Sequence, residues 1–177
     1  MIKGEGHFIA KLRDTRPVQV VKTKKNKRKK QNKASLTQEQ VALWKEFSAN
    51  FLKQDLFKVT ELQCYGDHLY YYNKNWPDIS RLKFMRPGLL LGIFKKKRFE
   101  PSYTLALSLS ATETDQKLAL TYEQWQQYVA GNTVTVTTPH KNGWYLLICD
   151  DKPFAFGKVV NGTVKNFFPK GLRFSFE

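Results

Sequence analysis

The chain has 177 residues, of which 41% are hydrophobic and 14% aromatic, so it can bury a core and is not a disordered polypeptide. Its formal net charge is +15, and residues 1–33 alone carry twelve Lys or Arg against two acids. Such a surplus of positive charge favours a polyanionic partner. The sequence has no amphipathic basic helix and no lipidation motif, so nucleic acid is favoured over a membrane surface.

Residues 1–21 lack the apolar centre of a secretory signal, and no apolar run of 18 residues occurs, so we expect a cytoplasmic protein. Cys64 and Cys149 are far apart and have no CxxC spacing, which favours reduced, buried thiols over a disulfide. The three histidines are equally scattered, so no zinc site is predicted.

Residues 1–13 contain an alternating apolar run that predicts one strand. It is either the last strand of a domain whose remainder is missing or a strand that docks on the downstream domain. Residues 22–33 then carry eight Lys or Arg and no acid, which predicts an extended linker. This linker can act as a solvated tether, as an electrostatic clamp on phosphates, or as both.

The first folded element begins after Leu36. Thr37 and Gln40 form a capping box, Leu36 and Val41 form a hydrophobic staple, and apolar residues at helical spacing predict a helix to about Lys53. Its aromatic stripe favours a core face over a base-stacking surface.

Residues 58–63 and 68–72 predict two strands around a Gly66-Asp67 turn. The tyrosines at 70–72 should alternate between faces, so one or two can be exposed, and an exposed Tyr can stack on an unpaired base.

Residues 86–109 are the most informative stretch. An apolar run over 89–94 predicts a buried strand, four cations follow at 95–98, and Ser102 predicts the cap of a short helix through Leu109. Between strand and helix, the cations would be held rigidly enough to contact phosphates. A solvated basic loop explains the same residues equally well.

The remaining chain predicts a helix and five strands. Leu120 and Thr121 repeat the staple and capping box, for a helix that runs to about Ala130 and ends at Gly131. Tight turns then separate strands that predict a small barrel or a strongly curled sheet, closed at one end by the helix. The expected strands are 133–138, 144–150, 154–160, 163–168 and 172–176.

No catalytic motif accompanies this pattern: the sequence has no Gly-rich phosphate loop, GxSxG or HExxH. Positive charge interleaved with aromatic residues and hairpins is typical of a nucleic-acid-binding module. An enzyme acting by itself is therefore the least favoured interpretation.

Three segments resemble one family, the RsmF-like (Sun-type) bacterial ribosomal-RNA 5-methylcytosine methyltransferases. Residues 4–13 resemble the closing strand of their catalytic domain, and residues 86–102 resemble the intermediate segment of their C-terminal extension. Residues 157–158 and 164–173 resemble the end of its PUA-like barrel. The resemblance implies a role in rRNA processing. Its catalytic cysteines are not matched, because Cys64 and Cys149 lack the Pro-Cys and Thr-Cys contexts.

The resemblance therefore implies an α+β, RNA-binding C-terminal region whose partner is ribosomal RNA. We expect a monomer with no membrane partner and no cofactor of its own, since S-adenosylmethionine would belong to the missing catalytic domain. The expected division is 1–13 for the remnant of that domain, 14–34 for the linker, 35–118 for an intermediate α+β segment and 119–177 for a PUA-like barrel.

Candidate RNA-binding residues are the cations of the two folded segments and one aromatic residue. Phe167 and Phe168 alternate on a predicted strand, so one should be core and the other is a candidate for stacking, for which we chose Phe168. The set is Arg86, Lys95, Lys96, Lys97, Arg98, Lys158, Lys165, Phe168, Lys170 and Arg173.

Two other functions stay open. One is a free-standing RNA- or ribosome-binding protein without enzymatic activity, which the gene sequence upstream of Met1 would distinguish. The other is a protein-interaction module in which the basic run is only a tether. Such a module would bind RNA weakly, and substitutions in residues 81–173 would not change that binding.

Overall fold

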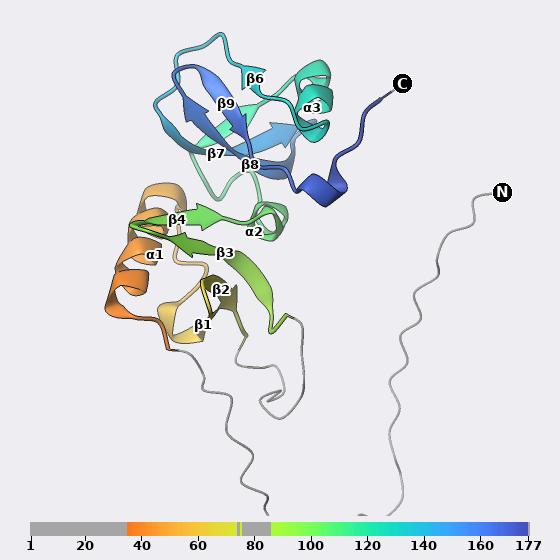
Figure 1. Cartoon of the computed structure of the whole chain (residues 1–177). Helices are drawn as coiled ribbons and strands as arrows, with labels where there is room; N and C mark the ends of the chain where they lie inside the picture. Colours follow the sequence, from red (N-terminus) through yellow and green to blue (C-terminus); the bar gives the residue numbers. More distant parts are fainter. Residues whose placement is uncertain (1–34, 74, 76–85, 177) are drawn as a thin grey trace, which may run out of the picture.

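The computed structural model describes residues 35–73, 75 and 86–176, so the strand and linker expected over residues 1–34 lie outside the described part of the chain. The described residues form two antiparallel-rich sheets, one above the other, with helices between and beside them (Figure 1). This arrangement confirms the α+β fold class.

The lower unit begins with helix α1 (Gln38–Phe51), whose predicted capping box is present. The Thr37 hydroxyl accepts the Gln40 N–H and the Gln40 side chain accepts the Thr37 N–H, which satisfies two otherwise unpaired donors. One face of the helix buries Trp44 and Phe51, so the aromatic stripe is core as predicted.

The lower sheet has four strands in sequential order. The predicted hairpin around Gly66 is present, although a 3₁₀ turn, η1 (Val59–Glu61), replaces the start of its first strand. Tyr70 is buried, and Tyr71 and Tyr72 are half-buried, so none of the three tyrosines is fully exposed. The strands are β1 (Leu62–Tyr65), β2 (His68–Tyr71), β3 (Leu89–Lys95) and β4 (Arg98–Pro101).

The four cations at 95–98 occupy a different element from the one predicted. We expected a loop between a strand and a helix, but Lys95 ends β3 and Arg98 begins β4, so the run forms a tight hairpin turn. The predicted helix follows β4 as α2 (Tyr103–Ser108), and the Ser102 hydroxyl accepts the Leu105 N–H as its cap. The hairpin was missed because β4 has only four residues, too few to show a strand period.

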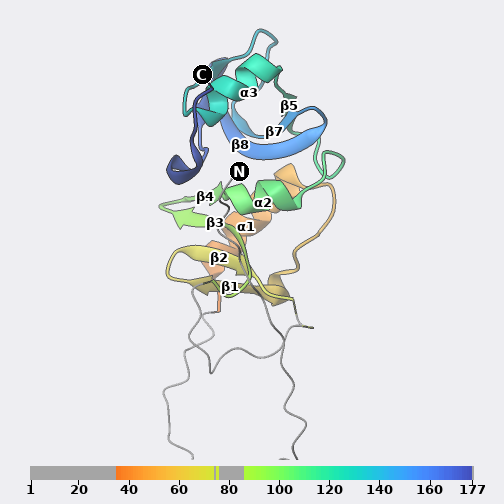
Figure 2. The same cartoon turned by 90° about the vertical axis from the view of Figure 1, so that its right-hand side faces the viewer.

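The upper unit is a curled five-stranded sheet with helix α3 (Tyr122–Val129) over one end (Figure 2). α3 starts at the predicted capping box, and the chain leaves it through Gly131, whose φ of +102° favours glycine. The sheet order is β5 (Lys117–Ala119), β7 (Gly143–Cys149), β8 (Lys152–Val160), β9 (Thr163–Asn166) and β6 (Val134–Thr135).

Two predictions about this sheet are wrong. Strand β5, which pairs in parallel with β7, was missed because three residues are too few to show a period. The strand expected over 172–176 is absent from the described chain, where residues 170–172 form a 3₁₀ turn, η2 (Lys170–Leu172), followed by an extended segment.

The two sheets share a core. Leu146 and Phe156 lie on the outer face of the upper sheet and pack with Trp44 and Phe51 of α1, whereas their alternating neighbours face the inner core of the upper unit. Helix α2 lies between the sheets and contacts both β3 and β8 (Figure 2). The described chain is therefore one packed body.

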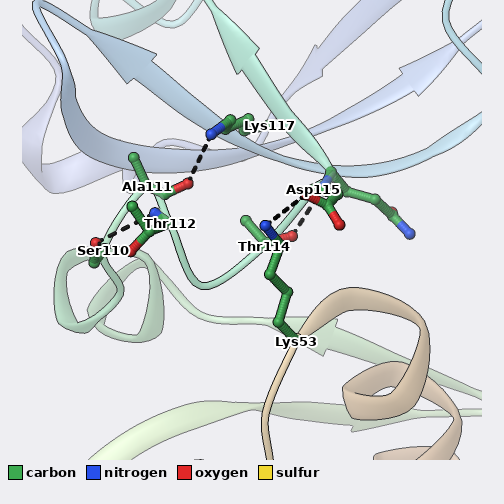
Figure 3. Close-up of polar contacts among 8 residues, drawn as sticks. Lys53, Ser110, Ala111, Thr112, Thr114, Asp115 and Lys117 are labelled. Carbon is green, nitrogen blue, oxygen red and sulfur yellow. Dashed lines mark hydrogen bonds and ion pairs between the residues drawn. The ribbon is translucent and has the colours of Figure 1, made fainter.

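A short connector, residues 110–116, is fixed to both units (Figure 3). The Lys53 N–H donates to the Glu113 carbonyl at 2.9 Å, and Lys53 Nζ lies 2.7 Å from Asp115 Oδ1. Thr114 is fully buried, and its hydroxyl accepts the Gln116 N–H. These contacts hold the upper sheet in a fixed orientation relative to α1. No described helix is both long and apolar enough to cross a bilayer.

Candidate functional site

The first candidate surface is the β3–β4 turn, residues 95–98, all four of which are exposed. Lys97 has a φ of +56°, in the left-handed region that costs a non-glycine residue about 1–2 kcal/mol.

Acids neutralise part of this turn. Lys95 Nζ lies 3.9 Å from Asp67 Oδ2, and the Arg98 guanidinium donates to Glu100 Oε1 at 2.9 Å. Neither Lys96 nor Lys97 forms an ion pair with any acid in the described part of the chain. The turn therefore presents two unpaired cations and two that can exchange a weak, solvent-exposed partner for a phosphate.

The second candidate surface lies on the outer face of the upper sheet. Trp144 pairs with Lys158, and Lys158 pairs with Lys165, so the three form one row across β7, β8 and β9. Directly paired residues project from the same face of an antiparallel sheet. Lys158 Nζ lies 5.8 Å from the centroid of the Trp144 ring, within range of a cation–π interaction.

Phe167 completes this surface, and here our choice of Phe168 is wrong. Phe168 is only 6% exposed and packs against Tyr103 of α2, because its side chain turns toward the core. Phe167 is 41% exposed, and its ring centroid lies 4.5 Å from that of Trp144. We call Trp144, Lys158, Lys165 and Phe167 the outer-face patch.

The other predicted cations are exposed but stand apart. Arg86 precedes β3, so it lies at the opposite end of that strand from Lys95. The C-terminal segment that carries Lys170 and Arg173 lies to the right in Figure 1, whereas the β3–β4 turn lies at the left beside α1. The ten predicted residues therefore do not form one continuous row.

Arg173 has a structural role. Its guanidinium donates to Asn166 Oδ1 and to the Phe168 carbonyl, and it covers Gly131, where a Cβ atom would collide with the arginine side chain. These contacts attach the C-terminal segment to α3 and β9. Arg173 is consequently less available to a phosphate than Lys158 or Lys165.

Sequence reasoning missed two aromatic features. Trp144 begins a predicted strand, but its position beside Lys158 depends on the β7–β8 register, which the sequence does not specify. A second group of rings gathers where the C-terminal segment crosses α3. It consists of Tyr122, Trp125, Phe174 and Phe176.

The thiols show no sign of activation. Cys64 is buried, and this burial is the main cause that raises the pKa of its thiol; burial also raises the pKa of the Cys149 thiol. A raised pKa keeps a thiol protonated, the opposite of what a nucleophilic cysteine requires. Among residues 35–73, 75 and 86–176, no three His, Cys, Asp or Glu side chains are placed to hold a metal ion.

Comparison with known protein families gives two successive matches. A model described as the RsmF rRNA methyltransferase first C-terminal domain matches residues 46–109, and one described as the methyltransferase RsmF PUA domain matches residues 115–174. The break between them falls within the connector of Figure 3. No individual curated protein matches the chain.

Proposed function

Because this chain is an RsmF-like C-terminal region, which matches that family's first C-terminal domain and PUA domain over residues 46–109 and 115–174, we propose that it binds ribosomal RNA and positions it for a catalytic methyltransferase domain. The observation that carries the proposal is the row of Lys158 and Lys165 beside two aromatic rings on a PUA domain. PUA domains generally bind RNA. The β3–β4 turn adds two unpaired cations from the other matched domain.

Both surfaces suit a phosphate backbone. Lys158 and Lys165 come from adjacent strands of a packed sheet, and Lys96 and Lys97 from a two-residue turn, so their backbones are ordered before RNA binds. Backbone order lowers the entropy lost on binding and lets the cations fix the orientation of the RNA.

We assign S-adenosylmethionine to the catalytic domain and not to this chain. In doubly wound folds a cofactor of this kind binds at the carboxyl ends of parallel strands. Of the described strand pairs, only β5–β7 is parallel, so the described residues do not fit such a site. The protein would act in the cytoplasm, where ribosomal RNA is modified.

Filter binding of the 177-residue chain to structured ribosomal RNA, repeated at several salt concentrations, tests the proposal. RNA affinity should fall as the salt concentration rises. In a plot of log affinity against log salt concentration, each duplex phosphate contact that is removed should make the slope shallower by about 0.9. Replacing Lys158 and Lys165 together with Gln should flatten the slope by about two contacts' worth. The matched control replaces Lys45 and Lys152, two exposed lysines outside the proposed surfaces.

An equal slope for both double variants would remove the outer-face patch from the interface. Weak binding that no change in residues 86–173 alters would instead favour the protein-interaction module with a basic tether. Reading the gene upstream of Met1 then distinguishes a methyltransferase region from a free-standing RNA-binding protein.

A further inference from the structure

The outer-face patch contains more than phosphate binding requires. A phosphate contact needs cations, yet Phe167, two residues after Lys165 in the chain, places a large aromatic ring, 41% exposed, against Trp144. Its ring meets Trp144 at 64°, edge to face, so this contact leaves at least one face of each ring uncovered by the other ring. An exposed phenyl ring that packs against Trp144, whose own ring lies near Lys158, has the components of a nucleotide-stacking site.

The Phe167 backbone is held in place before any ligand arrives. Its N–H donates to the hydroxyl of the buried Tyr128 at 2.8 Å. The preceding residue, Asn166, donates from its side-chain amide to the carbonyls of Tyr128 and Asn132, at 2.6 and 2.8 Å. The following residue, Phe168, is buried, so Phe167 is fixed from both sides along the chain.

The charges around the ring are also arranged for an anion. Lys158 and Lys165 are direct cross-strand partners, an arrangement that destabilises a sheet by like-charge repulsion. No acid of the described chain forms an ion pair with either lysine. A phosphate between them would relieve the repulsion, and a base attached to that phosphate would lie within reach of the aromatic rings.

We propose that the outer-face patch binds one unpaired nucleotide, whose base stacks on Phe167 next to Trp144 and whose flanking phosphates contact Lys158 and Lys165. This inference rests on the proposed function and narrows it to single-stranded or looped RNA. The bases of a continuous A-form helix are stacked inside the duplex and cannot reach an aromatic ring, whereas unpaired bases can.

The exposed ring cluster on α3 serves as a matched control. Phe174 is 46% exposed, close to the value for Phe167, but its ring packs among Trp125 and Phe176 and is not part of the lysine row. Nothing described shows what would cover that cluster, so we assign it no ligand. Phe174→Ala removes a similar exposed ring from another part of the same domain.

The test compares a ten-nucleotide oligoadenylate with a ten-base-pair blunt RNA duplex, each titrated against the full 177-residue chain by fluorescence anisotropy. Phe167→Ala should weaken oligoadenylate binding about 5- to 150-fold, the range that loss of one base–aromatic stack gives. Duplex binding should change less than about twofold, because it depends on the lysines. Phe174→Ala should leave both affinities unchanged.

A second measurement tests the proposal independently if Phe167→Ala fails to fold. If a base stacks in the patch, oligoadenylate should quench tryptophan fluorescence in the unaltered chain, and Trp144→Phe should lose most of that quenching. The stacking site is wrong if the chain binds the duplex and Phe167→Ala leaves the oligoadenylate affinity unchanged. It is also wrong if oligoadenylate quenches Trp144→Phe as strongly as the unaltered chain. Either result leaves the proposed function unaffected. Failure of the unaltered chain to bind either RNA overturns both.

Discussion

Lys158 and Lys165 face each other directly across β8 and β9, with Trp144 as the next residue in the row on the far side of Lys158. Like charges in direct cross-strand positions reduce sheet stability, whereas opposite charges there contribute roughly 0.2–1 kcal/mol. The two like charges therefore lower the stability of the sheet but favour the binding of an anion.

Replacing Lys165 with Glu should raise the free energy of unfolding by roughly 0.2–1 kcal/mol, because it converts the repulsive pair into an attractive one. The same change should weaken RNA binding, since it exchanges a cation for an anion beside the phosphate path. Urea unfolding and RNA filter binding measure the two effects. Lys170→Glu, at an exposed lysine of η2 outside the sheet, is the stability control. A destabilised Lys165→Glu would show that repulsion between the two lysines does not weaken this part of the sheet.

The β3–β4 turn allows charge to be removed without loss of the hairpin. Lys97→Asn should keep or slightly raise stability, because Asn tolerates the positive φ of this position better than Lys. Combined with Lys96→Gln, it should flatten the salt dependence of RNA binding by up to about two contacts' worth. Thermal melting checks the fold, and binding at several salt concentrations checks the slope. An unchanged slope in a well-folded double variant would exclude the turn from the RNA interface.

Features of this chain that depend on neighbouring residues could be predicted from the sequence, whereas features that depend on residues far apart could not. The capping boxes at Thr37 and Thr121 are local, involve four residues each, and were recognised correctly. The family resemblance, based on three short segments, is confirmed over residues 46–109 and 115–174. Register is not local, so neither the Trp144–Lys158 pair nor the opposed lysines could be predicted.

The choice between Phe167 and Phe168 shows the same limit. One ring lies in the core and one outside, as predicted, but both residues lie beyond the end of β9, where packing against α2 decides which ring is buried. The Tyr103 ring, 65 positions earlier in the sequence, is the contact that draws Phe168 inward. The hairpin formed by the four cations was missed for a different reason, since β4 is too short to show a period.

Gly92 in β3 is required by close packing. A Cβ atom at this position would overlap the Phe99 ring and the Glu100 carbonyl of the neighbouring strand β4. Because that backbone cannot move aside freely, Gly92→Ala should lower the free energy of unfolding by about 1–3 kcal/mol or more. Gly171→Ala, where nothing lies within 4 Å, is the matched control and should be close to neutral. Equal denaturation midpoints for the two variants would contradict the packing seen between β3 and β4.

The hydroxyl of Tyr128 joins α3 to β8 and to Phe167, the residue that follows β9. It donates to the Phe156 carbonyl at 2.7 Å and accepts the Phe167 N–H at 2.8 Å. Tyr128→Phe leaves both groups without this partner and should cost about 1–3 kcal/mol at pH 7. Because the Phe167 N–H is one of the groups released, oligoadenylate binding should weaken as well.

The same hydroxyl makes a pH-dependent contribution. Burial raises the pKa of Tyr128 well above its ordinary value, although the Phe167 N–H and nearby Arg173 act in the opposite direction. A raised pKa means that the folded state retains the proton while the unfolded chain releases it near pH 10. The contribution is therefore complete below about pH 10 and is lost as the pH rises further. Urea unfolding of the unaltered chain and Tyr128→Phe should show a smaller stability difference at about pH 10.5 than at pH 7, because Tyr128 ionises only in the unfolded unaltered chain. The difference is the quantity to compare because lysines and other tyrosines titrate in both proteins. A difference that stays constant would mean that Tyr128 does not hold its proton in the folded state.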